Sequence, residues 1–310
     1  MIVWIGLGLA LAALAISFAA YYIVFYSPHR GQNDERNLPT GEQYKSRTGA
    51  MLALIDALLV LPCETVSIPS SDGLRLSARY YPGREGAGVA ICFHGYRATA
   101  RRDFSGGARY LIDRGFHVLL VDQRAQGRSG GHTMTFGIRE RYDCLDWARY
   151  AAERFGADTP IALYGISMGA VTVLMAAGLD LPENVRCVVA DSPYSSPKEI
   201  ICSVCRRLSL PPALLWPFID LGARLFGHFR PDETTAADAV KAARVPVLIL
   251  HGEDDRYVPC EMSAAIAKAN GTMVERHTFP AAGHGISFLV DPERYKTLLT
   301  RFLKEKAQVL

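Results

Sequence analysis

Residues 164–170 read YGISMGA and place Ser167 midway between Gly165 and Gly169. Glycine has no Cβ, so it tolerates strained dihedral angles and close backbone contacts that a larger residue would not. An apolar run precedes this serine, and the run MGAVTVLMAAG, which favours a helix, begins directly after it. The stretch therefore predicts a serine at a sharp strand-to-helix turn, with its hydroxyl exposed as a nucleophile.

The rest of the chain alternates between short apolar runs and segments long enough to form helices. Strands are expected at 64–69, 74–81, 88–93, 116–121, 160–164, 185–190, 246–250 and 273–279, and helices at 101–114, 138–155, 168–179, 260–269 and 291–307. Continuous apolar strands that alternate with helices indicate a mostly parallel sheet covered on both faces. The expected fold class is therefore α/β with eight strands, and such folds bind ligands at the carboxyl ends of their strands.

A serine hydroxyl becomes a good nucleophile when a base takes its proton and an acid orients that base. Downstream of Ser167, HGEDDRYVP at 251–259 and AGHG at 282–285 each follow an expected strand. Acid and base therefore lie in loops at the sheet edge that carries the serine. His284 is the expected base, because it stands in a glycine-flanked loop. The candidates for the acid are Asp191, Asp254 and Asp255.

The chain resembles the alpha/beta-hydrolase superfamily of serine hydrolases over roughly residues 64–308. The resemblance rests on the order Ser, Asp, His along the chain. It also rests on five motifs: FHGY at 93–96, DQRAQGRS at 122–129, GISMG at 165–169, HGEDDRYVP at 251–259 and GHG at 283–285. In detail the chain is similar to membrane-anchored bacterial hydrolases and to the serine aminopeptidase and monoacylglycerol-lipase-like branch. The resemblance implies an alpha/beta-hydrolase fold with a short helical lid.

This resemblance also implies roles for individual residues. The family pattern His-Gly-x-x-Asp-x-x-Val-Pro puts the acid of the triad on Asp255 rather than on Asp254, and leaves Asp191 a capping or turn role. The backbone N–H groups of Tyr96 and Met168 would form the oxyanion hole. The family's reaction needs no metal or cofactor, so we expect neither.

The motif DQRAQGRS departs from the usual family form, which has Gly and His where this chain has Ala125 and Gln126. The departures fall in a structural loop and leave the triad intact. Two further histidines, His94 and His251, precede glycines in strand-end turns. We expect their imidazoles to bond loop backbone rather than to act in catalysis.

Residues 1–26 carry no charged side chain and are mostly Leu, Ala, Ile and Val. A helix of this length covers a hydrocarbon core of about 30 Å, and aromatic residues stand near both of its ends, as at membrane interfaces. We expect a retained transmembrane anchor. The alternative is a secretory signal peptide cleaved near 17–19, but the charged n-region is missing and the apolar run is too long.

The charges around this span predict its orientation. Arg30, Arg36, Lys45 and Arg47 follow the span, and no Lys or Arg precedes it. The positive-inside rule therefore places the large domain of this single-pass protein in the cytoplasm. The seven scattered cysteines form no disulfide framework, which also indicates a reducing compartment.

Two segments remain outside the alternating pattern. Residues 27–63 are expected to form a polar linker and then an apolar helix at 49–62 that either packs on the domain or lies on the membrane surface, with packing favoured. Within the hydrolase domain, 64–310, the connection after the strand at 185–190 is far longer than one helix requires. This insertion, at about 192–243, is expected to form the lid over the carboxyl edge of the sheet.

The formal net charge of +3 is small and the chain has no dense basic run, so nucleic acid is not an expected partner. We expect a serine hydrolase that cleaves an ester, thioester or amide of a small-molecule or lipid acyl substrate through an acyl-enzyme. One alternative is an aminopeptidase-like peptide hydrolase, in which Asp220, Asp232 and Glu233 would bind the substrate amine. The other is a non-catalytic binding protein on the same fold. The sequence makes no prediction of oligomeric state.

Overall fold

The computed structural model describes residues 1–28 and 34–309, so His29 and Arg30 lie outside the described residues. Its centre is an eight-stranded sheet with the order β1-β2-β4-β3-β5-β6-β7-β8. The strands are β1 (Glu64–Pro69), β2 (Arg75–Tyr81), β3 (Val89–Phe93), β4 (His117–Asp122), β5 (Ile161–Ile166), β6 (Val185–Asp191), β7 (Val247–Gly252) and β8 (Val274–Phe279). β2 pairs antiparallel with both neighbours, and the other pairs are parallel. The expected mostly parallel sheet is therefore confirmed.

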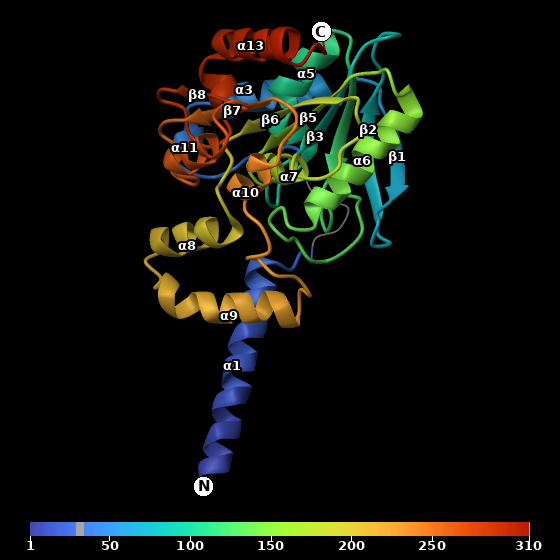
Figure 1. Ribbon diagram of the computed structural model, residues 1–310. Coiled ribbons are helices and arrows are strands. Elements are labelled where there is room, and N and C mark those ends of the chain that lie inside the picture. The colour runs from blue at the N-terminus through green and yellow to red at the C-terminus, as the bar shows by residue number, and fades with distance from the viewer. Residues whose placement is uncertain (29–33, 310) are drawn as a thin grey trace.

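Helices cover both faces of this sheet, as Figure 1 shows. One face carries α3 (Thr48–Leu59), α4 (Ala100–Asp103), α5 (Ser105–Asp113), α12 (Ser287–Val290), α13 (Pro292–Arg301) and a π-helical turn (Phe302–Lys306). The other face carries α6 (Glu140–Phe155), α7 (Met168–Ala176), α10 (Ala236–Lys241) and α11 (Cys260–Ala269). The central strands β3, β5 and β7 are buried at every position. Their continuous apolar runs reflect this burial on both faces.

Helix α7 packs against the sheet more closely than a side chain would allow. A Cβ at Gly169 would overlap the carbonyl oxygen of Phe93, and a Cβ at Gly165 would overlap the carbonyl oxygen of Gly169. All nine residues of α7 are buried. The two glycines around Ser167 are therefore required by the contact between α7, β3 and β5.

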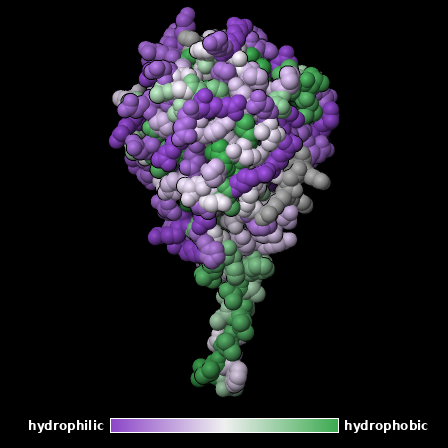
Figure 2. All heavy atoms as spheres, turned by 90° about the vertical axis from the view of Figure 1, so that its right-hand side faces the viewer, coloured by the Kyte–Doolittle hydropathy of each residue, from purple (hydrophilic) through white to green (hydrophobic). Residues whose placement is uncertain are grey.

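The N-terminal helix α1 (Ile2–Val24) is long and apolar enough to cross a membrane, and most of it projects from the domain as an apolar stalk (Figures 1 and 2). Its C-terminal end is different. Ser17, Tyr21 and the following Phe25 are buried, and Tyr21 and Phe25 belong to the main hydrophobic core. The end of α1 is thus part of the folded α/β domain rather than a tether to it.

The segment between α1 and β1 also lies on the domain where the structure describes it. It contains the short helix α2 (Glu42–Lys45) and α3, whose Ile55 and Leu58 are fully buried. Leu58 joins the core between α5, α13 and the sheet. The apolar helix expected at 49–62 therefore packs on the domain, against α4 and α5.

The long insertion after β6 contains α8 (Pro197–Arg207) and α9 (Pro212–Leu225) before α10. α9 crosses α1 at the point where α1 meets the domain (Figure 1). A Cβ at Gly222 would overlap the carbonyl oxygen of Ser17, and the ring of Phe226 lies 5.1 Å from that of Phe18. The insertion is thus packed on the membrane-type helix as well as on the core.

The close contact of α7 predicts the effect of adding one methyl group. Gly169→Ala should lower the free energy of unfolding by at least about 2 kcal/mol, because the backbone of β3 would have to move. Gly49→Ala adds the same methyl group to an exposed helical position with nothing within 4 Å. That control should raise stability by up to about 1 kcal/mol through helix propensity. Thermal unfolding in detergent measures both, and equal shifts of Tm would contradict the prediction.

Candidate active site

Ser167 lies at the turn between β5 and α7, at the carboxyl edge of the sheet. Its backbone has φ 55° and ψ −114°, a conformation that non-glycine residues rarely adopt and that costs about 1–3 kcal/mol. Its side chain is neither fully buried nor fully exposed. The strained turn therefore presents the hydroxyl to the surface of the domain, as expected for a nucleophile elbow.

The structure brings Ser167, His284 and Asp255 into one hydrogen-bonded chain. His284 follows β8, and its Nε2 lies 2.8 Å from the Ser167 hydroxyl oxygen. Asp255 follows β7, and its Oδ2 lies 2.6 Å from Nδ1 of His284. Because Nδ1–H donates to the carboxylate, Nε2 is left to accept the hydroxyl proton. The geometry is that of a nucleophile, a base and an orienting acid.

Asp255 accepts hydrogen bonds from other groups as well as from His284. Its Oδ1 accepts the backbone N–H groups of Tyr257 and Val258, each at 2.8 Å. Nε2 of His251 lies 3.3 Å from its Oδ2 and also donates to the Val258 carbonyl. Burial raises the pKa of Asp255, but the two imidazoles together lower it by a larger amount. The pKa of Asp255 therefore lies well below the ordinary value. The carboxylate is therefore charged. Asp254 is exposed to solvent, and it is Asp255 that bonds the imidazole of His284.

His284 lies half-buried beside this charge. Burial lowers the pKa of His284, but the Asp255 carboxylate raises it, and the net shift is upward. An imidazole with a raised pKa takes up a proton more readily from the serine hydroxyl.

A segment from the N-terminal region holds the backbone of His284, which sequence reasoning missed. The Tyr44 hydroxyl donates to the His284 carbonyl at 3.1 Å, and the Gln43 side-chain oxygen accepts the His284 N–H at 3.3 Å. Tyr257 in turn donates to the Thr40 carbonyl at 2.9 Å. No local sequence pattern around Gln43 and Tyr44 signals this role, because the contact spans about 240 residues.

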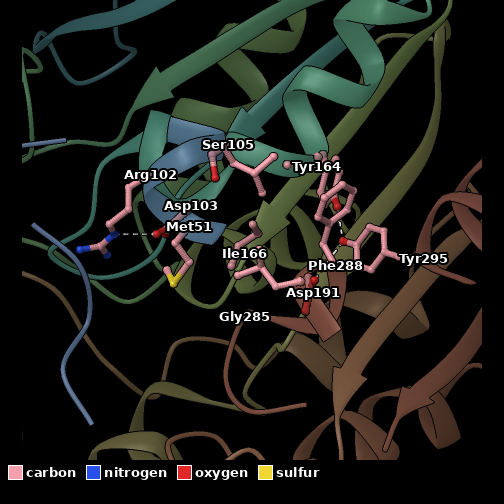
Figure 3. A pocket seen from close by; sticks show the side chains of 14 residues that line it. Met51, Arg102, Asp103, Ser105, Tyr164, Ile166, Asp191, Gly285, Phe288 and Tyr295 are labelled. Carbon is pink, nitrogen blue, oxygen red and sulfur yellow. Dashed lines mark hydrogen bonds and ion pairs between the residues drawn. The ribbon is translucent and has the colours of Figure 1, made fainter. Parts of the chain in front are cut away.

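Asp191, the third candidate for the acid, faces another partner. Its carboxylate accepts hydrogen bonds from Tyr295, at 2.9 Å, and from Ser192, also at 2.9 Å. Burial raises its pKa above the ordinary value. Figure 3 shows it with Tyr295 and Tyr164, whose hydroxyls bond each other, beside a cavity of about 30 Å³ behind Ile166. A cavity of that volume has room for water and not for a substrate.

The residues expected to form the oxyanion hole lie next to the serine. Met168 is the first residue of α7, and the first N–H groups of a helix have no partner within it. Among the described residues the N–H of Tyr96 donates no hydrogen bond. The preceding Gly95 passes so close to Ser167 that its Cβ position would be 3.3 Å from the Cβ of the serine. Met168 thus follows Ser167 directly, and Tyr96 follows the glycine that packs against it.

The loop that carries Tyr96 is fixed by polar contacts. His94 donates from Nδ1 to the Gly95 carbonyl at 2.8 Å, and its Nε2 accepts the N–H of Gln123 at 3.2 Å. Asp103 accepts the Gly95 N–H at 2.8 Å. The Gln123 side chain donates to the His94 carbonyl and accepts from Thr172 on α7. His94 and His251 therefore both bond loop backbone, and Gln123 ties the loop to α7.

The departures in DQRAQGRS have a visible consequence. Ala125 has φ 61°, in the region that favours glycine, so alanine adds local strain there. The neighbouring Arg124 is buried and makes a two-pronged ion pair with Asp143 on α6, with both distances 2.6 Å. The loop is held to α6 by this pair and lies outside the Ser167, His284 and Asp255 chain.

The three lid carboxylates considered for a substrate amine are already paired. Asp220 and Asp232 both bond Arg224, at 2.8 and 2.9 Å. Glu233 bonds Arg141. Their charges are compensated within the protein, so they do not form a free acidic pocket.

Comparison with known proteins agrees with this fold. Residues 84–232 match a family model described as serine aminopeptidase, S33. A protein of Bacillus subtilis named uncharacterized protein YqkD is 25% identical over 237 residues, covering 76% of this chain and 77% of that protein. A lysophosphatidylserine lipase of Danio rerio, ABHD12, is 28% identical over 232 residues, covering 70% of this chain and 58% of that protein.

Solved structures share the architecture. A Pyrococcus furiosus esterase, Pf2001, superposes with a TM-score of 0.68 at 22% identity, covering 91% of this chain and 98% of that chain. A Butyrivibrio proteoclasticus protein, Est1E, solved with ferulic acid bound, has a TM-score of 0.58 at 21% identity and covers 78% of this chain. At this identity the likeness shows the fold alone.

These findings define the class of the protein. The eight-stranded sheet and the strained turn at Ser167 are features of the alpha/beta-hydrolase fold. The Pyrococcus furiosus esterase shares this fold. The chain is therefore an alpha/beta-hydrolase by fold, and its sequence is similar to the serine aminopeptidase family over residues 84–232 and to a lysophosphatidylserine lipase of Danio rerio.

The two adjacent aspartates provide a test of the site. Asp255→Asn should lower turnover by a factor on the order of 10⁴, because the imidazole loses the acid that orients it. Asp254→Asn, the matched control, should stay within tenfold of the parent. The reverse ranking in two folded variants would move the acid to Asp254.

The same site predicts a pH profile. His284 must be neutral to accept a proton, so kcat/KM is lost as the pH falls through its pKa. Because that pKa is raised, the acid limb of the parent should have its midpoint above the ordinary value of 6.5. The midpoint should move to lower pH in Asp255→Asn, which lacks the neighbouring charge. An unchanged midpoint would show that Asp255 does not control the titration of His284.

Proposed function

We propose that the chain is a membrane-anchored serine hydrolase that cleaves a carboxylic ester, thioester or amide through an acyl-enzyme. Ser167 is the nucleophile, His284 the general base and Asp255 the orienting acid. The observation that carries the proposal is the continuous chain of hydrogen bonds, 2.8 and 2.6 Å long, that joins these residues from three different loops. A binding protein on the same fold would have no need for this strained and aligned arrangement.

The reaction follows from the geometry in two half-reactions. The Ser167 oxygen attacks the substrate carbonyl while its proton passes to Nε2 of His284. The N–H groups of Tyr96 and Met168 stabilise the resulting oxyanion, aided by the positive end of the α7 dipole. His284 then protonates the leaving alcohol, thiol or amine as the acyl-enzyme forms. Water attacks the acyl carbon, gives its proton to His284, and the acid leaves as the proton returns to Ser167.

An ester substrate of lipid origin is favoured over a peptide. The carboxylates that would hold a peptide amine are paired with Arg224 and Arg141. Exposed apolar side chains, in contrast, gather at the end of the domain from which α1 projects. They include Leu214, Leu221 and Leu225 of α9. The name of the Danio rerio relative, a lysophosphatidylserine lipase, supports the same class of substrate.

The position of α9 supports a location at the bilayer surface. α1 is exposed from Ile2 to Ile16 and first becomes buried at Ser17, beside α9. At about 1.5 Å per residue this exposed part is roughly 22 Å long, shorter than a hydrocarbon core of about 30 Å. If α1 spans the bilayer, the apolar face of α9 therefore lies at its boundary. Arg36, Lys45 and Arg47 after the span favour a cytoplasmic hydrolase domain.

An active-site probe tests the proposed nucleophile. A fluorophosphonate should label the detergent-solubilised full chain at Ser167, and Ser167→Ala should remove about 10⁶ of the rate of ester hydrolysis. Ser192 is an internal control, because it also follows a strand and has φ 55°. Peptide mapping should find the label on Ser167 and none on Ser192. A folded, active parent that takes no label, or takes it elsewhere, would contradict the mechanism.

Acyl chain length tests the proposed substrate class. The value of kcat/KM should climb from acetyl to octanoyl esters, because each buried CH₂ contributes about 0.8 kcal/mol. Trp216 of α9 packs against the main core, so Trp216→Ala should flatten that climb and leave acetyl ester cleavage nearly unchanged. Leu214→Ala, at an exposed position of the same helix, should preserve the climb. A parent that prefers acetyl esters would overturn the lipid assignment and leave small esters or peptides.

A further inference from the structure

The C-terminal end of α1 is bonded to the loop that carries one of the proposed oxyanion donors. The Tyr96 hydroxyl donates to the Val24 carbonyl at 2.8 Å. The adjacent Arg97 guanidinium donates to the carbonyls of Ile23, at 2.9 Å, and Tyr26, at 3.1 Å. The last carbonyls of a helix have no partner within it, so these two side chains satisfy groups that otherwise need water. The positive charge of Arg97 also suits the negative end of the helix dipole.

The end of α1 is itself rigidly held, so it can serve as a platform. Phe25 is fully buried, and its ring meets those of Phe136 and Phe229 edge-on at 5.8 and 5.1 Å. Its carbonyl accepts the Met134 N–H at 2.8 Å. The last turns of α1 are therefore fixed to the segment that leads from β4 to α6.

The oxyanion loop has two sets of restraints on either side of the Tyr96 N–H. On the side that precedes it, His94 and Asp103 hold the Gly95 peptide groups from within the domain. On the side that follows it, the Tyr96 side chain and Arg97 hold on to α1. Arg97 has φ 50°, so the chain turns sharply directly after Tyr96. Only the second set ties the direction of the Tyr96 N–H to the N-terminal helix.

We infer that α1 is part of the apparatus that positions the oxyanion hole, with the Tyr96 side chain and Arg97 as positioning residues. The inference rests on the proposed serine hydrolase function. α1 and the loop that carries Tyr96 then form one unit. Loss of the hydrogen bonds from Tyr96 and Arg97 to α1 lets the Tyr96 N–H move away from the developing negative charge. Removing an oxyanion donor altogether costs about 10²–10³ in kcat. Loosening one donor should cost a part of that factor.

Two matched substitutions separate this role from general packing. Tyr96→Phe removes only the hydroxyl and keeps the backbone N–H and the ring contact with Phe136, at 5.1 Å. Tyr21→Phe also removes one 2.8 Å hydrogen bond between α1 and the domain, but it does not touch the oxyanion loop. In the full-length protein in detergent, Tyr96→Phe should lower kcat on the order of tenfold with KM nearly unchanged. It should slow fluorophosphonate labelling by a similar factor, and Tyr21→Phe should stay within twofold of the parent.

Hydrogen–deuterium exchange of the peptide spanning 94–99 provides a readout that does not depend on activity. Exchange there should rise in Tyr96→Phe and not in Tyr21→Phe, while Tm changes by similar amounts in both. Arg97→Gln, which removes the other contact, should reproduce the effect of Tyr96→Phe. Equal kinetics and equal exchange in the Tyr96 and Tyr21 variants would overturn the inference. A parent that is neither labelled nor active would instead overturn the proposed function, and the exchange data would still decide the positioning role.

Discussion

The packing of α7 against β3 is the contact on which the rest of this structure depends. At Gly169 the helix backbone approaches the Phe93 carbonyl so closely that no side chain fits between them. This approach requires the chain to turn at Ser167 in a strained left-handed conformation. Burial of the whole of α7 in the core offsets the strain. The same contact presents the serine hydroxyl and starts α7 directly after it, so one packing constraint positions both the proposed nucleophile and one of the two proposed oxyanion donors.

The charge of Asp255 is stabilised by groups from two separate segments of the chain. Asp255 collects donors from His284, His251 and two backbone N–H groups, which keep it charged although it is buried. Asp191, equally buried, faces a tyrosine and a serine and has a raised pKa. Two aspartates at neighbouring strand ends thus have pKa values shifted in opposite directions because their partners differ. Asp255 is the one that bonds the imidazole of His284, and its charge would stabilise an imidazolium there.

The N-terminal region contributes to both sides of the site. The end of α1 is bonded to the loop of Tyr96, and Gln43 and Tyr44 bond the backbone of His284. The apolar end of the domain beside α9 adjoins the exposed part of α1 (Figure 1). A fragment that began after Phe25 would lose Tyr21 and Phe25 from the core as well as the apolar helix. The membrane-type helix and the hydrolase domain are therefore best regarded as one folded structure.

The sequence by itself determined the sheet, because buried parallel strands must be continuous apolar runs and each expected strand lies within two residues of an observed one. It also placed Ser167 at its turn, because the glycine spacing reflects a local steric requirement. The family pattern pointed to Asp255 over Asp254, a choice that local chemistry left open because both residues are aspartates. Only the tertiary structure decided three sets of contacts: the hydrogen bond from Tyr44 to His284, the contacts of Tyr96 and Arg97 with α1, and the pairing of the lid carboxylates with arginines. These contacts join residues far apart in the chain, and their geometry depends on how whole elements pack, which no local pattern of residues records.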